Sequence, residues 1–306
     1  METLLSICIP TYNRAPYLKE MLTRLIDQIK ELPCQDIIEL FISDNCSTDN
    51  TFSIVKEFEI TAPYLKYYKN ETNLGMDGNF INCFNKAKGK FVWLLGDDDY
   101  LLPGKLKVIL DILKRKDYGL IHLNTRKDLD ARDGEYDDSN EFLSKVSFWS
   151  TFISGNIVNS MYVNLIDFEK YRGTFLTILP PYLLAAKNSK YNYFCKDFFL
   201  DISHNYSRNG GYNYIQVFCN NYLSIWKDYC VKDKNDIKWY EKEKKNLFLG
   251  HLKSGIYNLL IYKKNRDQFL TKNSWKVLYR HYKTRPYFYT SLAKMYARYL
   301  LNTLKK

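Results

Sequence analysis

The chain has 306 residues, 46% hydrophobic and 26% charged, so it holds enough apolar material for a core and is not disordered overall. No apolar run approaches the ~20 residues that a membrane-spanning helix needs. The net charge of +11 is unevenly distributed, since residues 214–306 carry 20 Lys and Arg against 6 Asp and Glu, whereas residues 1–213 carry 25 against 28. We therefore expect two parts with different roles, residues 1–213 and residues 214–306.

The cysteines and the N-terminal residues bear on the cellular compartment. The seven cysteines are odd in number and form neither a CxxC motif nor a cluster with histidines. This usage favours a reduced, cytosolic setting over a disulfide framework or a zinc site. The first residues lack the basic segment of a signal peptide and reach Pro10 early. We therefore expect a cytoplasmic protein.

Strand and helix signals alternate over the first third of the chain. The expected strands are Leu4–Ile9, Ile37–Ile42, Leu65–Tyr68, Phe91–Leu95 and Gly119–Leu123. The expected helices are Ala15–Glu31, a helix carrying Phe52, Val55 and Phe58 that Ser47 or Asp49 could cap, Asp77–Ala87 and Pro103–Lys114. Repeated β-α-β units predict an α/β fold with a Rossmann-like, mainly parallel sheet flanked by helices.

The remainder of the chain has a less regular pattern. Lys127–Glu141 is polar and acidic, which predicts an exposed loop, and Phe148–Val163 is compatible with a pair of strands. Tyr191–Ile202 has the alternation of a strand. Beyond Tyr214 a helical pattern rich in Lys, Tyr, Leu and Trp continues to the end, which predicts a helical appendage.

Three polar segments are expected at one rim of the sheet, because ligands bind beyond the carboxyl ends of parallel strands. They are Pro10–Arg14, Ser43–Asp49 and Gly96–Asp99. The three consecutive carboxylates of the last segment would repel one another by on the order of a few kcal/mol at low dielectric. A hard divalent cation, Mn²⁺ or Mg²⁺, would relieve this repulsion and can bridge to diphosphate oxygens. The alternative is a solvated, Asp-rich turn that caps the helix beginning near Pro103.

Four segments resemble glycosyltransferase family 2, in the family's order and at its usual spacing. They are CIPTYNR (Cys8–Arg14), ISDNCSTDNT (Ile42–Thr51), NLGMDGNF (Asn73–Phe80) and GKFVWLLGDDDYLLPGKL (Gly89–Leu106). Within the family, the chain most resembles bacterial surface-polysaccharide transferases, including abequosyltransferase-like enzymes, which share the GDDD version of the metal motif. The resemblance implies a GT-A fold and inverting, metal-dependent transfer of a sugar from a nucleotide donor to an acceptor hydroxyl.

The resemblance also assigns the nucleoside-binding residues. Pro10, Thr11 and Tyr12 match the family's loop against the nucleoside, and Arg14 lies near the same pocket. Asp44 matches the acidic residue that hydrogen-bonds the base edge, which is uracil N3–H in the members that use UDP. A UDP-sugar is therefore the favoured donor.

The donor sugar and the metal are assigned in the same way. Asn73 and Gly75 match the family's NxG turn, and Asp77 could face the donor sugar. Alignment of the YLLPG tail places Asp98 at the metal-binding end of the DxD motif and Asp99 directly after it, and both are expected metal ligands. The resemblance aligns Gly96 with the first Asp of the motif, so that carboxylate is missing here. Asp97 is expected to take over its ribose or metal contact. His204 lies where some relatives have a histidine that helps to hold the metal. The alternative for His204 is an ordinary rim residue.

The general base is the least defined residue of the expected site. Family members usually supply it from an ED pair downstream of the metal motif, where this chain reads GTFLTILPPY without an acid. Asp197 and Asp201 are the nearest later candidates, and they would share a face if both lay on one strand. The alternative for each is an exposed strand residue. Without an ED pair, a catalytically silent sugar-nucleotide-binding protein of the same fold remains an alternative to the enzyme.

The basic tail mixes cations with aromatic residues, as in Trp239-Tyr240, Tyr257–Tyr262 and Tyr279–Tyr289. Such a composition suits an anionic membrane surface, which would place the protein peripherally on the inner face of the plasma membrane, beside a glycan or lipid-linked glycan acceptor. A helical appendage with a solvated basic face is the alternative. Nucleic acid is not an expected partner, because no RNA- or DNA-binding motif accompanies the charge.

Overall fold

A computed structural model describes residues 2–125, 131–202, 211–263 and 269–304. The chain divides into two compact units, Met1–Asn205 and Tyr206–Lys306. The division lies shortly before residue 214, where the charge of the sequence changes sign.

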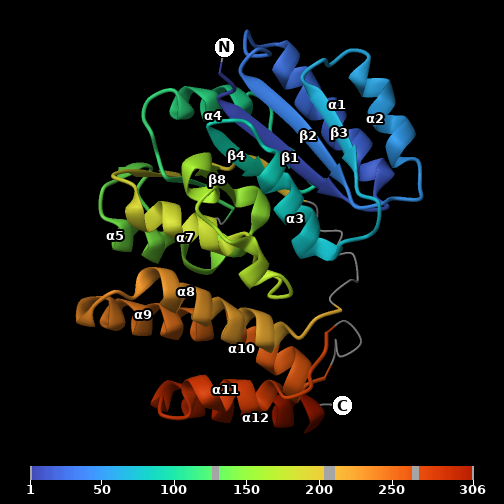
Figure 1. The fold of residues 1–306 in the computed structure, drawn as a ribbon. Coiled ribbons are helices and arrows are strands. Elements are labelled where there is room, and N and C mark those ends of the chain that lie inside the picture. The colour runs from blue at the N-terminus through green and yellow to red at the C-terminus, as the bar shows by residue number, and fades with distance from the viewer. Residues whose placement is uncertain (1, 126–130, 203–210, 264–268, 305–306) are drawn as a thin grey trace. The chain divides into compact units, whose positions relative to one another are not determined.

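The N-terminal unit is built on an eight-stranded sheet with the order β3-β2-β1-β4-β8-β6-β9-β7 (Figure 1). The strands are β1 (Leu5–Thr11), β2 (Ile38–Asp44), β3 (Leu65–Lys69), β4 (Phe91–Leu94), β6 (Leu120–Leu123), β7 (Gly134–Tyr136), β8 (Asn156–Asn159) and β9 (Asn192–Cys195). Strands β3, β2, β1 and β4 are parallel neighbours, as are β6 and β9. β8 runs antiparallel to β4 and β6, and β7 antiparallel to β9. The predicted α/β fold with a mainly parallel sheet is confirmed.

Helices cover both faces of this sheet because successive side chains of a strand point to opposite sides. Leu5, Ile7 and Ile9 of β1 belong to a buried cluster with the apolar faces of α1 (Ala15–Lys30) and α4 (Lys105–Leu113). Cys8 points to the other face, where its thiol contacts the Cys83 carbonyl of α3 (Gly75–Lys86). The other helices of the unit are α2 (Thr51–Glu59), α5 (Ser139–Val146), α6 (Ser160–Val163) and α7 (Leu179–Asn188).

A second, two-stranded sheet lies next to the Asp triplet. Strand β5 (Asp99–Leu101) pairs antiparallel with β10 (Leu200–Ile202), and Ile202 lies opposite Asp99. The expected strand Tyr191–Ile202 is therefore two short strands, β9 and β10, which belong to different sheets.

Two other expectations for the middle of the chain are wrong. Phe148–Val163 is not a pair of strands: the 3₁₀ turns η1 (Ser147–Thr151) and η2 (Ile153–Gly155) precede β8 and α6. The amide of Asn156 donates to the Phe152 carbonyl at 2.8 Å and so closes this turn locally. The described part of Lys127–Glu141 includes β7 and the start of α5, where the Asp138 side chain accepts from the backbone N–H groups of two following residues as an N-cap.

The C-terminal unit is helical, as predicted. Its elements are η4 (Gln216–Asn221), α8 (Tyr222–Cys230), α9 (Lys234–Leu247), η5 (Phe248–Leu252), α10 (Lys253–Gly255), η6 (Ile256–Ile261), α11 (Ser274–Tyr282) and α12 (Pro286–Leu304). Aromatic residues form its core, in which Trp226 stacks on Trp239 and Phe248 contacts Tyr282. None of the helices in the described ranges is both long and apolar enough to span a bilayer.

Candidate functional site

The carboxyl ends of β1 and β4 are joined by polar side chains. Thr11, the last residue of β1, donates its hydroxyl hydrogen to Asp97 Oδ2 at 2.7 Å. Arg14 Nε lies 2.9 Å from Asp97 Oδ1, and the other end of the guanidinium pairs with Asp98. A guanidinium presents several N–H donors in one plane, so a single arginine can hold both carboxylates. The structure thus brings Thr11, Arg14, Asp97 and Asp98 together, as the motifs predicted.

The three carboxylates of the triplet have different environments. Burial raises the pKa of Asp97 to about 7, although Arg14 and Thr11 act to lower it. Burial likewise raises the pKa of Asp99 to about 6, against a hydrogen bond from Ser154. The side chain of Asp98 is 23% exposed, so it is the member of the triplet most open to a ligand.

The hydroxyl of Ser154 is hydrogen-bonded to both Gly96 and Asp99. The Ser154 hydroxyl donates to Asp99 Oδ2 at 2.5 Å and accepts from the Gly96 N–H at 2.9 Å. A Cβ on residue 96 would lie 2.8 Å from Asp99 Oδ2 and 3.2 Å from Ser154 Oγ. A larger residue at position 96 would therefore require Asp99 or Ser154 to shift, so glycine fits closely against both side chains. Ser154 has no local signal in the sequence, because it reaches the triplet only through the fold.

The residues of the triplet fit a divalent cation. Arg14 pairs with two of the three carboxylates, and Asp99 is hydrogen-bonded to Ser154 instead, so the cluster carries an excess of negative charge when all three are ionised. No group of three His, Cys, Asp or Glu side chains arranged to hold a metal occurs in the described ranges. Mg²⁺ is usually bound by one or two carboxylates together with substrate phosphates, and Asp98 and Asp97 can supply such a pair. His204 lies outside the described residues.

Asp44 ends β2 and is fully buried. Its Oδ1 accepts from the Ser47 N–H at 2.8 Å, and its Oδ2 accepts from the Tyr67 hydroxyl at 2.6 Å. Burial, with the neighbouring Asp44, raises the pKa of Tyr67 well above its usual value, so the phenol remains a donor. Each carboxylate oxygen of Asp44 thus already accepts from a protein donor, and the residue has no exposed surface. Tyr67, on β3, is a partner that sequence reasoning missed.

The loops after β1 and β2 are joined through Asn13. Its side-chain oxygen accepts from the Thr48 N–H at 2.8 Å, and its own N–H donates to Ser47 Oγ at 2.9 Å. Asn13 has φ of 52°, a left-handed conformation that asparagine tolerates better than most residues. Pro10 is buried at the end of β1, and the ring of Tyr12 is 43% exposed beside this junction.

The NxG turn is held by a residue that the sequence did not single out. Asn73 Oδ1 accepts from the Gly75 N–H and from the side-chain amide of Asn45, both at 2.8 Å. Gly75 has φ of 71°, which suits glycine at this turn. Asn45 Oδ1 also accepts from the Leu74 N–H at 2.9 Å, so Asn45 ties the NxG turn to the end of β2.

Asp77 holds a loop from a distant part of the chain. Its Oδ2 accepts from the N–H groups of Gly173 (2.8 Å) and Phe175 (3.0 Å), and its Oδ1 accepts from the Thr177 hydroxyl (3.2 Å). Asp77 is 7% exposed. The segment in which family members carry the ED pair is therefore fixed by the carboxylate of Asp77.

The two base candidates do not share a strand, so the expectation of a common face is wrong. Asp197 lies in the turn between β9 and β10, and its carboxylate is 3.4 Å from Lys105 Nζ. Asp201 lies in β10 opposite Tyr100, and its carboxylate is 3.6 Å from Arg24. Their side chains are 81% and 61% exposed, respectively. Both are open to solvent, and Asp201 belongs to the strand that pairs with Asp99.

Comparisons with known proteins agree with this arrangement. A model of the family "Glycosyl transferase family 2" matches residues 6–171, more than half of the chain. The abequosyltransferase RfbV of Salmonella typhimurium is 38% identical over 107 residues, which are 35% of this chain and 31% of the relative. A GalNAc(5)-diNAcBac-PP-undecaprenol beta-1,3-glucosyltransferase of Campylobacter jejuni is 28% identical over 182 residues, 56% of this chain and 55% of the relative. The chain thus spans about a third and about half of these two relatives.

Solved structures show the same fold. A fragment of TarS of Staphylococcus aureus, residues 1–349 in complex with UDP, superposes with a TM-score of 0.68 at 14% identity, covering 97% of this chain and 89% of the fragment. A mannosyltransferase of Pyrobaculum calidifontis in complex with GDP-Man and Mn²⁺ superposes with a TM-score of 0.52 at 15% identity, covering 99% and 88%. The expected GT-A fold is confirmed.

Proposed function

Since the chain belongs to glycosyl transferase family 2, we propose that it transfers a sugar from a nucleotide-sugar donor to an acceptor hydroxyl in bacterial surface-polysaccharide synthesis. The single observation that carries this proposal is the convergence of Thr11, Arg14, Asp97 and Asp98 at one rim of the sheet. These residues come from two motifs far apart in the sequence, and together they form a charged site at the place where α/β sheets bind ligands.

Divalent metal dependence is part of the proposal. Asp98, with Asp97 beside it, would hold Mn²⁺ or Mg²⁺, which supplies charge neutralisation at a departing nucleoside diphosphate. Arg14 positions both carboxylates and limits their mutual repulsion, and Thr11 fixes the orientation of Asp97. Asp99 accepts a hydrogen bond from Ser154, and its proposed role is to hold the conformation of the motif. Interactions that strengthen as the diphosphate departs stabilise the transition state more than the bound donor.

We propose UDP-sugars as donors, with Asp44 accepting a hydrogen bond from the base. The TarS structures contain UDP and UDP-GlcNAc, which supports this choice by likeness of fold. Ser47 and Tyr67 orient the carboxylate of Asp44. Pro10, Tyr12, Asn73 and Gly75 would complete the nucleoside and sugar contacts around it.

An inverting mechanism requires a base that takes the acceptor proton on the face opposite the leaving group. Asp201 and Asp197 are the proposed candidates, since both are exposed. Their ion pairs are long, at 3.6 Å from Arg24 to Asp201 and 3.4 Å from Lys105 to Asp197. Asp77 is less suited, because three protein donors already occupy its carboxylate. Its proposed role is to position the loop 173–177.

The acceptor is proposed to be a glycan or a lipid-linked glycan. The named activity of the Campylobacter jejuni relative concerns a PP-undecaprenol-linked acceptor, and that of TarS a poly(ribitol-phosphate). The excess of Lys and Arg in the C-terminal region supports peripheral association with an anionic membrane. Co-sedimentation with anionic vesicles at low salt, lost at 1 M salt where the Debye length falls to ~3 Å, tests this association.

A catalytically silent sugar-nucleotide binder is the second candidate, because the segment GTFLTILPPY contains no acidic residue that could act as the general base. A thermal-shift screen of nucleotides and nucleotide sugars, with and without Mn²⁺, identifies the donor, since a ligand that binds only the folded state raises its stability. Incubation of that donor with candidate acceptors then separates the two functions. A new glycoside product supports the enzyme, whereas binding without any product from a broad acceptor set supports the silent binder.

A further inference from the structure

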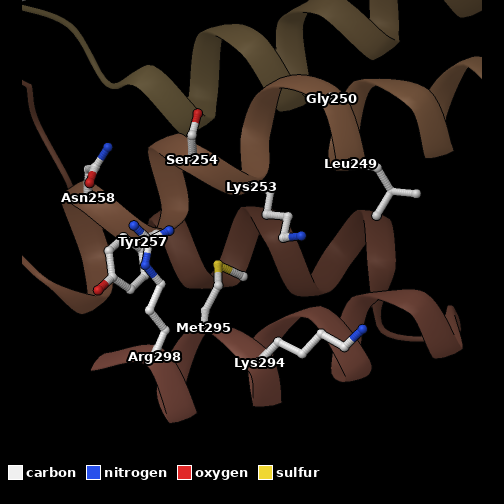
Figure 2. A pocket seen from close by; sticks show the side chains of 9 residues that line it. All are labelled: Leu249, Gly250, Lys253, Ser254, Tyr257, Asn258, Lys294, Met295 and Arg298. Carbon is white, nitrogen blue, oxygen red and sulfur yellow. The ribbon is translucent and has the colours of Figure 1, made fainter. Parts of the chain in front are cut away.

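The C-terminal unit contains a cavity of about 380 Å³ between the helical segment 249–258 and α12 (Figure 2). Its volume lies in the range of about 300–1,000 Å³ that is usual for small-molecule sites. The lining residues are Leu249, Gly250, Lys253, Ser254, Tyr257, Asn258, Lys294, Met295 and Arg298. Three of them are cations and none is an acid, so the cavity has the charge of an anion site.

The three cations have no carboxylate partner among the residues that the structure describes. Glu241 of the same unit pairs with Lys244 and Arg285 instead. Lys294 and Arg298 are four residues apart on α12, so they lie on one face of that helix. Lys253 projects from the segment 249–258 toward α12 in Figure 2. Three cations around one hollow repel one another, and an anion bound between them would relieve that repulsion.

The guanidinium of Arg298 packs on an aromatic ring at the cavity. It lies over the ring of Tyr257, with the guanidinium carbon 5.0 Å from the ring centroid. The Tyr257 hydroxyl accepts from the amide of Asn302 at 3.2 Å, and the ring is 8% exposed. A guanidinium restrained by a buried ring loses less side-chain entropy on binding an anion than a free one does.

The cavity also has an apolar side. Met295, Leu249 and the Tyr257 ring line it, and Leu249 is 41% exposed. Leu301 lies one turn beyond Arg298 on the same face of α12 and is 60% exposed. An apolar chain attached to an anion in the cavity can therefore continue over exposed leucine side chains.

We propose that this cavity binds the phosphate group of an amphiphilic phosphate ester, with Lys253, Lys294 and Arg298 on the phosphate and Leu249, Met295 and Leu301 along the apolar chain. The three cations carry the phosphate in this proposal, because the Ser254 hydroxyl already donates to the His251 carbonyl at 3.1 Å. The ligand class includes the phosphate of a lipid-linked acceptor and the headgroup of an anionic membrane lipid. The site lies wholly in the C-terminal unit and is independent of the proposed transfer chemistry.

Binding of farnesyl diphosphate to the full chain, measured by calorimetry with UDP present to fill the donor site, tests the proposal. Two variants address the cavity differently. Lys294→Gln with Arg298→Gln removes two charges, whereas Gly250→Leu keeps every charge and adds an apolar side chain at a residue that lines the cavity. A Cβ on Gly250 would meet nothing within 4 Å, so the added side chain enters open space. Lys276→Gln with Arg280→Gln is the matched control: it also removes one Lys and one Arg four residues apart, from the exposed surface of α11.

We expect both cavity variants to weaken farnesyl diphosphate binding by on the order of tenfold or more, and the control pair to change it less than twofold. Pyrophosphate and farnesol should each bind at least tenfold more weakly than farnesyl diphosphate. Competition by phosphatidylglycerol vesicles would identify the membrane headgroup as the source of the phosphate, and its absence would identify a lipid-linked acceptor.

Equal weakening by the control pair would overturn the proposal, because it would show diffuse attraction to a basic surface. Unchanged binding in folded Gly250→Leu and Lys294→Gln/Arg298→Gln proteins would overturn it as well. UDP affinity, measured separately in every variant, is expected to stay unchanged. A wild-type protein that fails to bind UDP would refute the proposed function while leaving the cavity measurement valid without UDP.

Discussion

Thr11 donates a hydrogen bond of 2.7 Å to Asp97, 86 residues further along the chain, and so joins the end of β1 to the loop after β4. Arg14, three residues after Thr11, pairs with the same carboxylate and with Asp98. Two loops that each have little regular structure are thereby held as one charged rim. The proposed donor site therefore depends on contacts between the loop after β1 and the loop after β4, and a substitution in either loop should affect it.

Asp98→Asn should abolish transfer and weaken metal-dependent donor binding, because a neutral amide replaces a carboxylate where charge neutralisation is needed. Calorimetry of UDP with and without Mn²⁺, together with a product assay, measures both effects. Asp111→Asn is the control, since Asp111 is an exposed residue of α4 that pairs with Lys107 on the same helix. Full transfer by Asp98→Asn in the presence of EDTA would contradict metal dependence.

Asp44→Ala should weaken UDP binding by about 1.5–3 kcal/mol, the range for a hydrogen bond to a charged group. Tyr67→Phe should have a smaller effect in the same direction, because it removes one of the two donors that orient Asp44 but leaves the carboxylate. The wild type should bind UDP or dTDP more tightly than ADP or CDP, since uracil and thymine offer a ring N3–H donor where adenine and cytosine have an unprotonated ring nitrogen. Equal calorimetric affinities for UDP and ADP would exclude this role for Asp44.

Gly96→Ala should destabilise the folded protein by about 1–3 kcal/mol, because the added Cβ would lie 2.8 Å from Asp99 Oδ2 in a packed region. Gly250→Ala is the matched control: its Cβ meets nothing within 4 Å, and alanine favours a helix over glycine by up to ~1 kcal/mol. Urea unfolding of both variants measures the difference. If Gly96→Ala proves as stable as the wild type, the close fit of Gly96 to Asp99 does not restrict position 96.

The stability of the C-terminal unit should fall as the pH is lowered from about 6.5 toward 4. Burial lowers the pKa of His251 and of His281 to about 4 each, whereas a histidine of an unfolded chain titrates near 6.5. The unfolded state then binds more protons in this range, so the stabilisation is complete above pH 6.5 and is lost as the pH falls toward 4.

The expected loss is on the order of 1–2 kcal/mol for each histidine, allowing for partial exposure. Calorimetric melting between pH 7.5 and 5 measures it. His251→Phe with His281→Gln should flatten the dependence, since neither replacement titrates in this range. A slope that is the same in the double variant and the wild type would show that other groups cause the acid destabilisation.

Much of the N-terminal fold could be predicted, because strand and helix periodicity is a local property. The ranges expected around β1, β2, β3, β4 and β6 match the strands closely, and the basic tail is helical as expected. The errors fall where local signals compete, as in the turn that Asn156 closes before β8. The separation of β9 from β10 depends on their pairing with different partners, which no local pattern records.

By itself, the sequence determined which chemical groups lie at the carboxyl ends of β1, β2 and β4. Each motif directly follows its strand in the sequence, so parallel strands bring the motifs to the same edge of the sheet. Only the tertiary structure decided what each group contacts. Asp77 reaches the loop at Gly173, Ser154 reaches Asp99, and Lys253 faces α12 across a cavity, through contacts between residues 40 to 100 positions apart. Such partners are selected by packing of complete helices and strands, and side-chain hydrogen bonds form only after that packing has fixed the distances.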